Sequence, residues 1–250
     1  MRKYAGTRVL MVLVMIGIST GLSALAEASE TYYSDDFAYE VVDGNATIVR
    51  YMNISADIVL DVPDQIDNHP VTQIGDQAFM MCGRLTGITL PESLISIGNG
   101  AFRSCRGLTE IFIPENVIAI GYYPFRSCTA LGRIDVAEGN PVYAAIDGML
   151  IDTHEKILVA YPIALPDETC EIAQGILRIG ENAFYGSENL AGIAIPGSVI
   201  SVSKGAFDMC RGLRRIEVAD ENPVYASFDG VLYDTQQKVL LAYPAGLSDE

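Results

Sequence analysis

The sequence predicts a β-dominated solenoid, in which short coils stack on one another and bury a continuous core. A six-residue phrase, I-G-N-G-A-F at 97–102, recurs with small changes from Ile74, Ile120, Ile179 and Val202. Successive copies begin 23, 23, 59 and 23 residues apart, and 59 is one period of 23 plus an insertion of 36. Fixed periods of roughly 20 to 50 residues are typical of stacked repeats, which cannot bury their apolar faces alone. We therefore expect function to lie on a long surface rather than in one pocket.

Residues 1–26 have the pattern of a secretory signal peptide. Basic residues precede an apolar run from Val9 to Ile18, and Ala24-Leu25-Ala26 supplies the small residues of a cleavage site. A membrane-anchoring helix is the less favoured alternative, because a bilayer needs about 20 apolar residues and this run is shorter. The sequence thus predicts export to a secreted or cell-surface location, with no membrane insertion after the signal is removed.

The chain is strongly acidic. Cleavage after Ala26 removes three of the 16 basic residues and leaves 13 against 32 acidic ones, a formal charge of −19. Nucleic-acid phosphates and anionic lipid headgroups are bound by basic patches. Nucleic acid and membrane surfaces are therefore predicted to be poor partners, and solubility is a sufficient reason for the excess of acid.

One repeat has the form L-x-x-I-x-I-P-x-x-V-x-x-I-G-x-x-A-F-x-x-C. Two apolar positions separated by one residue indicate a strand that buries one face, and stacked coils would place these strands in parallel, about 4.8 Å apart. The predicted inward pairs are Ile88/Leu90, Ile111/Ile113, Ile134/Val136, Cys170/Ile172, Ile193/Ile195 and Ile216/Val218.

The remainder of the repeat predicts how the chain turns. The proline ends the strand because it has no N–H to donate. The glycine of the phrase, at Gly75, Gly98, Gly121 and Gly180, predicts a second bend with positive φ. The A-F-x-x-C stretch is too short for a stable helix, so we expect one helical turn. Its phenylalanines should stack as one column, formed by Phe79, Phe102, Phe125, Phe184 and Phe207.

Four of the five cysteines share one repeat position, at Cys82, Cys105, Cys128 and Cys210, and the remaining coil has Ser187 there. A disulfide or a metal site is one interpretation. However, side chains about 4.8 Å apart are at the long end for a disulfide, and no C-x-x-C pair or histidine accompanies them. We expect buried free thiols, and no metal or other cofactor.

The insertions, at about 137–165 and 219–247, are two copies of one module. The segment 136–165 matches 218–247 at 18 of 30 positions. An Asp-Gly dipeptide and flanking apolar runs predict a β-hairpin in each copy. Two alternatives stay open: the modules protrude and bind a partner, or they pack as extra coils.

The two ends of the chain are predicted to differ. Residues 27–73 form an N-terminal cap, with a hairpin from Phe37 to Tyr51, and residues 74–250 form the solenoid. The second module stops where the first continues into a new strand. This predicts an uncapped sheet edge at the C-terminal end, which invites self-association.

The repeat and its period resemble the BspA-like leucine-rich-repeat family over about residues 37–250, including the N-P-V-Y-A-x-x-D-G-x-L-x-D segments from Asn140 and Asn222. The resemblance implies a leucine-rich-repeat solenoid in a secreted or surface protein that binds host or neighbouring-cell molecules, with no catalytic residues to carry over. This chain departs from the pattern at Pro124, Ser203 and Ala173 and in its missing C-terminal continuation.

The residues themselves give no catalytic constellation. His69 and His154 are far apart in the repeat, and no nucleophile and base can be paired. We therefore predict a non-enzymatic protein that binds an extracellular protein or glycoprotein; the alternatives are an assembly module that self-associates and, remotely, an exported hydrolase. The binding face would be the outward ladder between the core pairs, formed by Thr89, Phe112, Asp135, Glu171, Ala194 and Glu217. An ordinary solvated sheet face is the alternative interpretation of this ladder.

Overall fold

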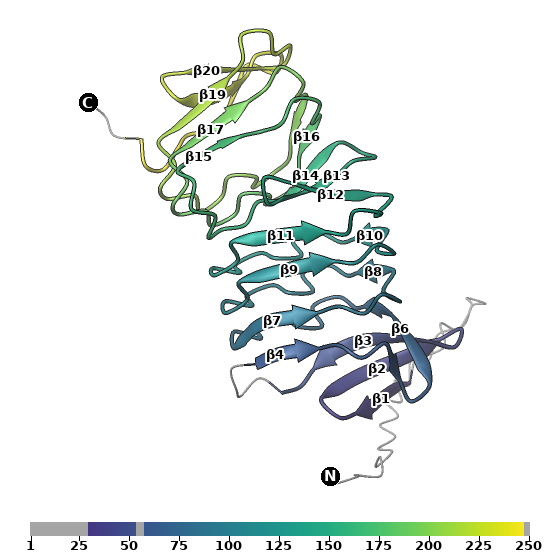
Figure 1. The fold of residues 1–250 in the computed structure, drawn as a ribbon. Coiled ribbons are helices and arrows are strands. Elements are labelled where there is room, and N and C mark those ends of the chain that lie inside the picture. Colours follow the sequence, from purple (N-terminus) through teal and green to yellow (C-terminus); the bar gives the residue numbers. More distant parts are fainter. Residues whose placement is uncertain (1–29, 54–57, 248–250) are drawn as a thin grey trace, which may run out of the picture.

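The structure is a computed structural model that describes residues 30–53 and 58–247; the predicted signal peptide lies outside these residues. The coils stack one on another (Figure 1). One row of strands carries the long strand of each coil and follows the predicted inward pairs. Its members are β4 (Ile58–Asp61), β7 (Leu85–Thr89), β9 (Glu110–Ile113), β11 (Arg133–Val136), β15 (Thr169–Glu171), β17 (Gly192–Ile195) and β19 (Arg215–Val218).

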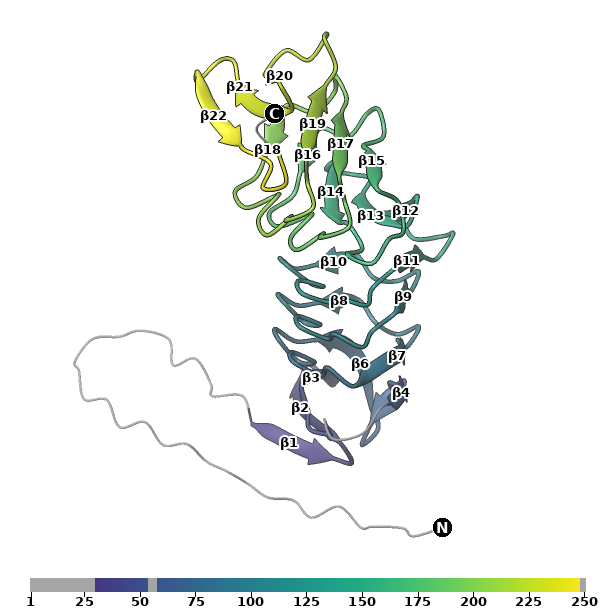
Figure 2. The ribbon, with the colours of Figure 1, turned by 90° about the vertical axis from the view of Figure 1, so that its left-hand side faces the viewer.

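A second row lies on another side of the coils, as Figure 2 shows for β8 and β10 against β7 and β9. It comprises β6 (His69–Ile74), β8 (Ser96–Ile97), β10 (Ala119–Ile120), β14 (Ile157–Ala160), β16 (Arg178–Ile179) and β18 (Ser201–Val202). The pairings within both rows are parallel, for example β9 with β11 and β16 with β18. The solenoid with parallel strands is thus confirmed.

The N-terminal part extends the second row. β1 (Thr31–Ser34), β2 (Phe37–Val42) and β3 (Asn45–Tyr51) pair antiparallel in order, β3 then pairs parallel with β6, and β5 (Gln65–Ile66) pairs with β6. The predicted hairpin from Phe37 to Tyr51 is present as β2 and β3. Asp43 and Gly44, both with positive φ, form its turn.

The A-F-x-x-C stretch is not helical, so that prediction is wrong. Among residues 30–53 and 58–247 there is no helix; these stretches are hydrogen-bonded turns. Alternate N–H groups point to the next coil: Met81 N–H donates to the carbonyl of Arg103, and Ser104 N–H to that of Arg126. Both Met81 and Ser104 have positive φ, near 65°, which a right-handed helix does not allow. Bonds between coils replace the bonds a helix would make within itself.

The glycines of the repeated phrase also have another role than predicted. None of Gly75, Gly98, Gly121 and Gly180 has a positive φ. The coils simply pass too close for a side chain: a Cβ at Gly98 would lie 2.5 Å from the backbone nitrogen of Asp76, and one at Gly121 would lie 2.6 Å from that of Asn99. Close approach between coils, rather than an unusual dihedral angle, requires glycine here.

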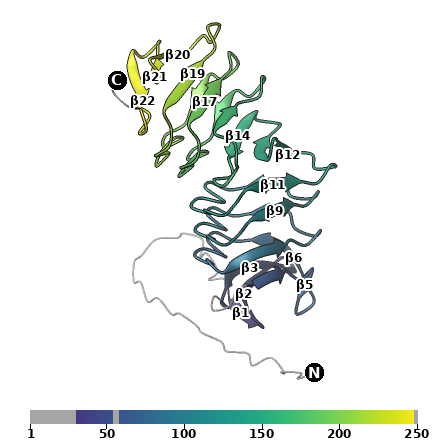
Figure 3. The same ribbon diagram turned by 60° about the vertical axis from the view of Figure 1, so that its left-hand side comes forward.

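The phenylalanines form two columns instead of one. Tyr51, Phe79, Phe102 and Phe125 stack at centroid distances of 5.2 to 5.8 Å, and Tyr161, Phe184 and Phe207 form a second column at 5.0 and 5.7 Å. The apolar core is likewise divided into two clusters. The break falls at the first module, and the strands beyond it are tilted relative to those before it (Figure 3).

The modules are extra coils, which decides between the two alternatives. Each is a three-stranded meander: β12 (Tyr143–Ile146), β13 (Met149–Asp152) and β14 in the first copy, and β20 (Tyr225–Phe228), β21 (Val231–Asp234) and β22 (Val239–Ala242) in the second. β14 pairs parallel with β16, so the meander continues the second row. In β13, Leu150 packs into the first core cluster, whereas Met149 and Ile151 pack into the second.

One asparagine ties each module to the coil before it. Asn140 Nδ2 donates to the carbonyls of Pro114 and Val117, both at 2.9 Å, while its Oδ1 accepts from the N–H groups of Val142 and Tyr143. Asn222 repeats the four contacts one module later. These bonds satisfy backbone groups that the turn would otherwise leave without partners. The shared N-P-V-Y segment therefore has a structural reason.

Candidate interaction surfaces

The six predicted ladder residues occupy the outer side of the long-strand row, in two groups. Asp135 pairs with Phe112 across β11 and β9, and Phe112 is half exposed. Glu171, Ala194 and Glu217 are neighbours across β15, β17 and β19. Thr89, in β7, lies on the exposed side of the same row. The first module separates the groups, because Gly148 of its turn accepts the N–H of Ile134 in β11.

Two carboxylates of this ladder are already paired. Arg133 Nε lies 2.7 Å from Asp135 Oδ2, and Arg215 Nε lies 3.1 Å from Glu217 Oε1. Exposed pairs of this kind contribute little to stability, up to about 1 kcal/mol. These pairs reduce the unpaired charge on this face. Phe112 is the largest exposed apolar side chain among the six ladder residues. The binding role of the six residues stays a prediction.

A second surface was missed by the sequence reasoning. Four aliphatic side chains just before the short strands point outward and are 40% to 52% exposed: Ile95, Ile118, Leu177 and Ile200. We call these four residues the aliphatic stripe. Neighbouring members are joined through the backbone, since Ile118 N–H donates to the carbonyl of Ile95 and Ile200 N–H to that of Leu177. The repeats themselves contain the signal for this surface. When they are aligned, the position after the V of V-x-x-I-G is Ile or Leu in four coils.

The cysteines are buried, as predicted. All five are free thiols in the core. Cys105 Sγ donates to the carbonyl of Phe79 at 3.0 Å, and Cys128 and Cys210 donate to the carbonyls of Phe102 and Phe184. Burial raises the pKa of Cys170 to about 12 and that of Cys210 to about 11. These thiols are inert core groups, because the nucleophile and the metal ligand is the thiolate.

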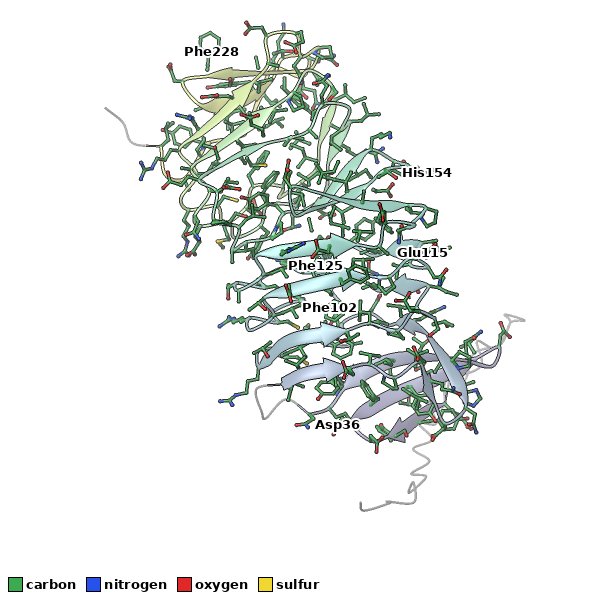
Figure 4. All side chains as sticks on the ribbon, in the orientation of Figure 1. Asp36, Phe102, Glu115, Phe125, His154 and Phe228 are labelled. Atoms are coloured by element: carbon green, nitrogen blue, oxygen red, sulfur yellow. The ribbon has the colours of Figure 1, made fainter. Side chains whose placement is uncertain are left out.

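The histidines are separated, as expected. His69 Nδ1 lies 3.0 Å from the carbonyl oxygen of Gly44 in the N-terminal part, whereas His154 is exposed in the turn between β13 and β14 (Figure 4). Within the described ranges, 30–53 and 58–247, no group of three or more His, Cys, Asp or Glu side chains is placed to hold a metal ion. In those same ranges no helix is long and apolar enough to cross a membrane.

Comparison with known proteins decides the family. The model of the BspA type leucine rich repeat region matches residues 65–143 and 167–228 in six copies, which is more than half of the chain. The chain belongs to the BspA-type leucine-rich repeat family. The matched ranges leave out residues 144–166, which form most of the first module, in agreement with its status as an insertion in the repeat.

Solved structures similar to this BspA-type repeat protein are bacterial. The pneumococcal vaccine antigen PcpA is 16% identical, with a TM-score of 0.53 over 78% of this chain and 72% of that one. A leucine rich cell surface protein from Faecalibacterium prausnitzii is 21% identical (TM-score 0.41; 77% of each chain). A leucine rich repeat protein of T. pallidum is 25% identical (TM-score 0.44; 72% of this chain and 68% of that one). The likeness to PcpA supports the fold alone. No curated protein matches the chain.

Proposed function

We propose that this protein is a non-enzymatic extracellular interaction protein, secreted or held at the cell surface, that binds a host or neighbouring-cell protein or glycoprotein. The observation that carries the proposal is the aliphatic stripe. Single exposed apolar residues are common, but each pair of the stripe, Ile95 with Ile118 and Leu177 with Ile200, repeats the same apolar position on adjacent coils. Exposed apolar patches of this kind are typical of protein interfaces. Family membership and the predicted signal peptide support a role outside the cell.

The test is surface plasmon resonance with residues 27–250 against purified extracellular-matrix and serum proteins. Replacing Ile118 and Ile200 by serine should weaken binding of a captured partner about tenfold or more, since central apolar contacts carry most of the interface energy. Val42→Ser is the matched control, because Val42 is equally exposed but lies in the N-terminal part. Equal losses in control and stripe variants would contradict the proposal.

The predicted ladder is tested with the same partner. If it shares the interface, the double variant Phe112→Ala/Asp135→Ala should also bind more weakly and keep its thermal stability, since both side chains lie outside the core. Unchanged affinity in a folded double variant would remove the ladder from the interface and leave the aliphatic stripe.

We propose self-association as a second candidate, favoured by a comparison of the two modules. Leu158 and Tyr161 in the first module are covered by the following coil and are 0% and 6% exposed. Their counterparts Leu240 and Tyr243 are 52% and 54% exposed, with no coil over β22 in the part of the chain that the structure describes. Sedimentation velocity should show dimers or longer species that Leu240→Ser/Tyr243→Ser abolishes. A monomer at every concentration would contradict this candidate.

A further inference from the structure

Six of the 16 basic residues of this acidic chain lie on one edge of the solenoid. We define the turn edge as the segments between the core aromatic position and the next long strand, 79–84, 102–109, 125–132, 161–168, 184–191 and 207–214. They contain six arginines and four acidic residues, whereas the chain as a whole has 16 basic and 32 acidic residues. The turns after the long strands, 90–95, 114–118, 137–142, 172–177, 196–200 and 219–224, contain five acidic residues and no basic one. Glu115, labelled in Figure 4, belongs to these acidic turns.

Arg106 and Arg211 of the turn edge are not paired with a carboxylate among the described residues. The ion pairs of Arg133, Arg178 and Arg215 lie outside the turn edge. Neighbouring guanidinium groups repel one another, and an anionic ligand would relieve that repulsion.

Two of these arginines line a hollow of about 450 Å³ at the junction of the two core clusters. Arg106 comes from a coil of the first cluster and Arg211 from a coil of the second. The wall between them carries hydrogen-bonding groups from Thr129, Tyr185 and Asn189. A hollow of this size is within the range of small-molecule sites.

One tyrosine of the hollow is held by a turn-edge arginine. The guanidinium carbon of Arg126 lies 4.0 Å from the centroid of the Tyr185 ring. A cation over an aromatic face at this distance is attractive. The contact joins a coil before the first module to a coil after it, so it fixes the two walls of the hollow relative to one another.

We propose that this hollow binds an acidic oligosaccharide, a short glycan bearing carboxylate or sulfate groups. Guanidinium groups bind planar and tetrahedral oxyanions through two parallel hydrogen bonds, so two arginines at different walls can each bind one acidic group of the same oligosaccharide. Hydroxyl and amide side chains match the hydroxyl groups of the sugars. A duplex nucleic acid would need a longer basic surface, and the acidic turns of the other edge oppose it. The site is separate from the aliphatic stripe and the ladder.

The hollow also contains one carboxylate, Glu188. It repels an anionic ligand and therefore limits affinity. Replacing it should strengthen binding, whereas replacing the arginines should weaken it. This pair of opposite effects distinguishes a specific site from a fold that is merely damaged by substitution.

The experiment is isothermal titration of the full chain with size-matched oligosaccharides: a sulfated glycosaminoglycan fragment, an oligouronate and a neutral oligosaccharide. Binding of the sulfated or the carboxylated chain, and not of the neutral one, is expected, and the stronger of the two identifies the acidic group. Arg106→Gln/Arg211→Gln should weaken it by about tenfold for each arginine, and Glu188→Gln should strengthen it about fivefold. Arg133→Gln/Arg178→Gln removes the same charge elsewhere and should stay within about twofold, since exposed pairs contribute little.

Several outcomes would overturn the proposal. They are binding of neither acidic chain, equal binding of the neutral chain, equal losses in the Arg133/Arg178 control, or equally tight binding of a short DNA duplex that the Arg106/Arg211 variant also loses. The last result would mean a general attraction of polyanions to the turn edge. Circular dichroism of each variant verifies that it is folded before titration.

Discussion

Ser187 offers a sharp test of how neighbouring coils are joined. At its repeat position, Cys105, Cys128 and Cys210 each donate from Sγ to a carbonyl of the preceding coil, at 2.9 to 3.0 Å. The Ser187 hydroxyl is fully buried and has no hydrogen-bond partner among the described residues. Each cysteine donates to the residue 26 positions before it, and the residue 26 positions before Ser187 is Tyr161. A carbon–oxygen bond is shorter than a carbon–sulfur bond, so the serine hydroxyl does not extend as far as a thiol would.

The substitution Ser187→Cys should therefore stabilise the protein. A buried polar group without a partner costs about 1 to 3 kcal/mol, and the cysteine both removes that cost and restores the bond between coils. We expect a gain of about 1 to 2 kcal/mol, which for a domain of this size is a rise in Tm of roughly 3 to 6 °C. The reverse substitution, Cys128→Ser, should lower stability by a similar amount.

The assay is urea unfolding followed by circular dichroism, with the thermal midpoint as a second measure. The two variants should move the unfolding midpoint in opposite directions. An unchanged or lower midpoint for Ser187→Cys would refute the reasoning. It would mean that the hydroxyl is satisfied in solution or that the larger sulfur does not fit.

Three further predictions concern the core and the modules. Phe102→Ala should cost about 3 to 5 kcal/mol, because Phe102 is fully buried between two stacked rings, whereas the exposed Phe228→Ala should stay within about 0.5 kcal/mol in the same urea titration. Burial raises the pKa of Cys210 from 9.0 to about 11. The stability that the protonated Cys210 thiol contributes is therefore fully present below pH 9 and is lost as the pH rises through 11. Cys210→Ala should flatten that part of the curve of urea midpoint against pH. Asn140→Ala removes two donated and two accepted hydrogen bonds and should cost about 2 to 4 kcal/mol, measured as a lower Tm.

The strand rows could be predicted because the inward pairs obey a local rule. Ile111 and Ile113 are both buried while Phe112 between them is exposed, as the alternation of side chains along a strand requires. The 23-residue period then fixes which strands are neighbours, without any further information. The turns could not be predicted in the same way, because their bonds join Met81 to Arg103 and Ser104 to Arg126 in separate coils. A helical turn is the local solution for such a segment, and stacking overrides it.

The role of the modules depended on contacts that one copy alone does not reveal. The sequence predicts a hairpin in each, and β13 and β14 form it. Whether the hairpin protrudes depends on β14, whose Leu158 pairs with Ile179 in the next coil. Leu158 has a counterpart, Leu240, that is exposed because no such coil lies over it among the described residues. The same sequence pattern thus leads to different burial, depending on whether a following coil covers the module.

Composition alone does not predict how charge is distributed over the surface. A net charge of −16 argues against anionic partners only if the charges are evenly mixed over the surface. In a solenoid they need not be, because each repeat position forms its own row along the molecule. One or two arginines in four of the turn-edge segments therefore create a basic edge, and acidic residues in four of the turns after the long strands create an acidic one. Beyond a Debye length of about 10 Å the acidic edge is largely screened, so the turn edge presents positive charge to a ligand in spite of the acidic total. For a repeat protein, partner classes should be judged row by row.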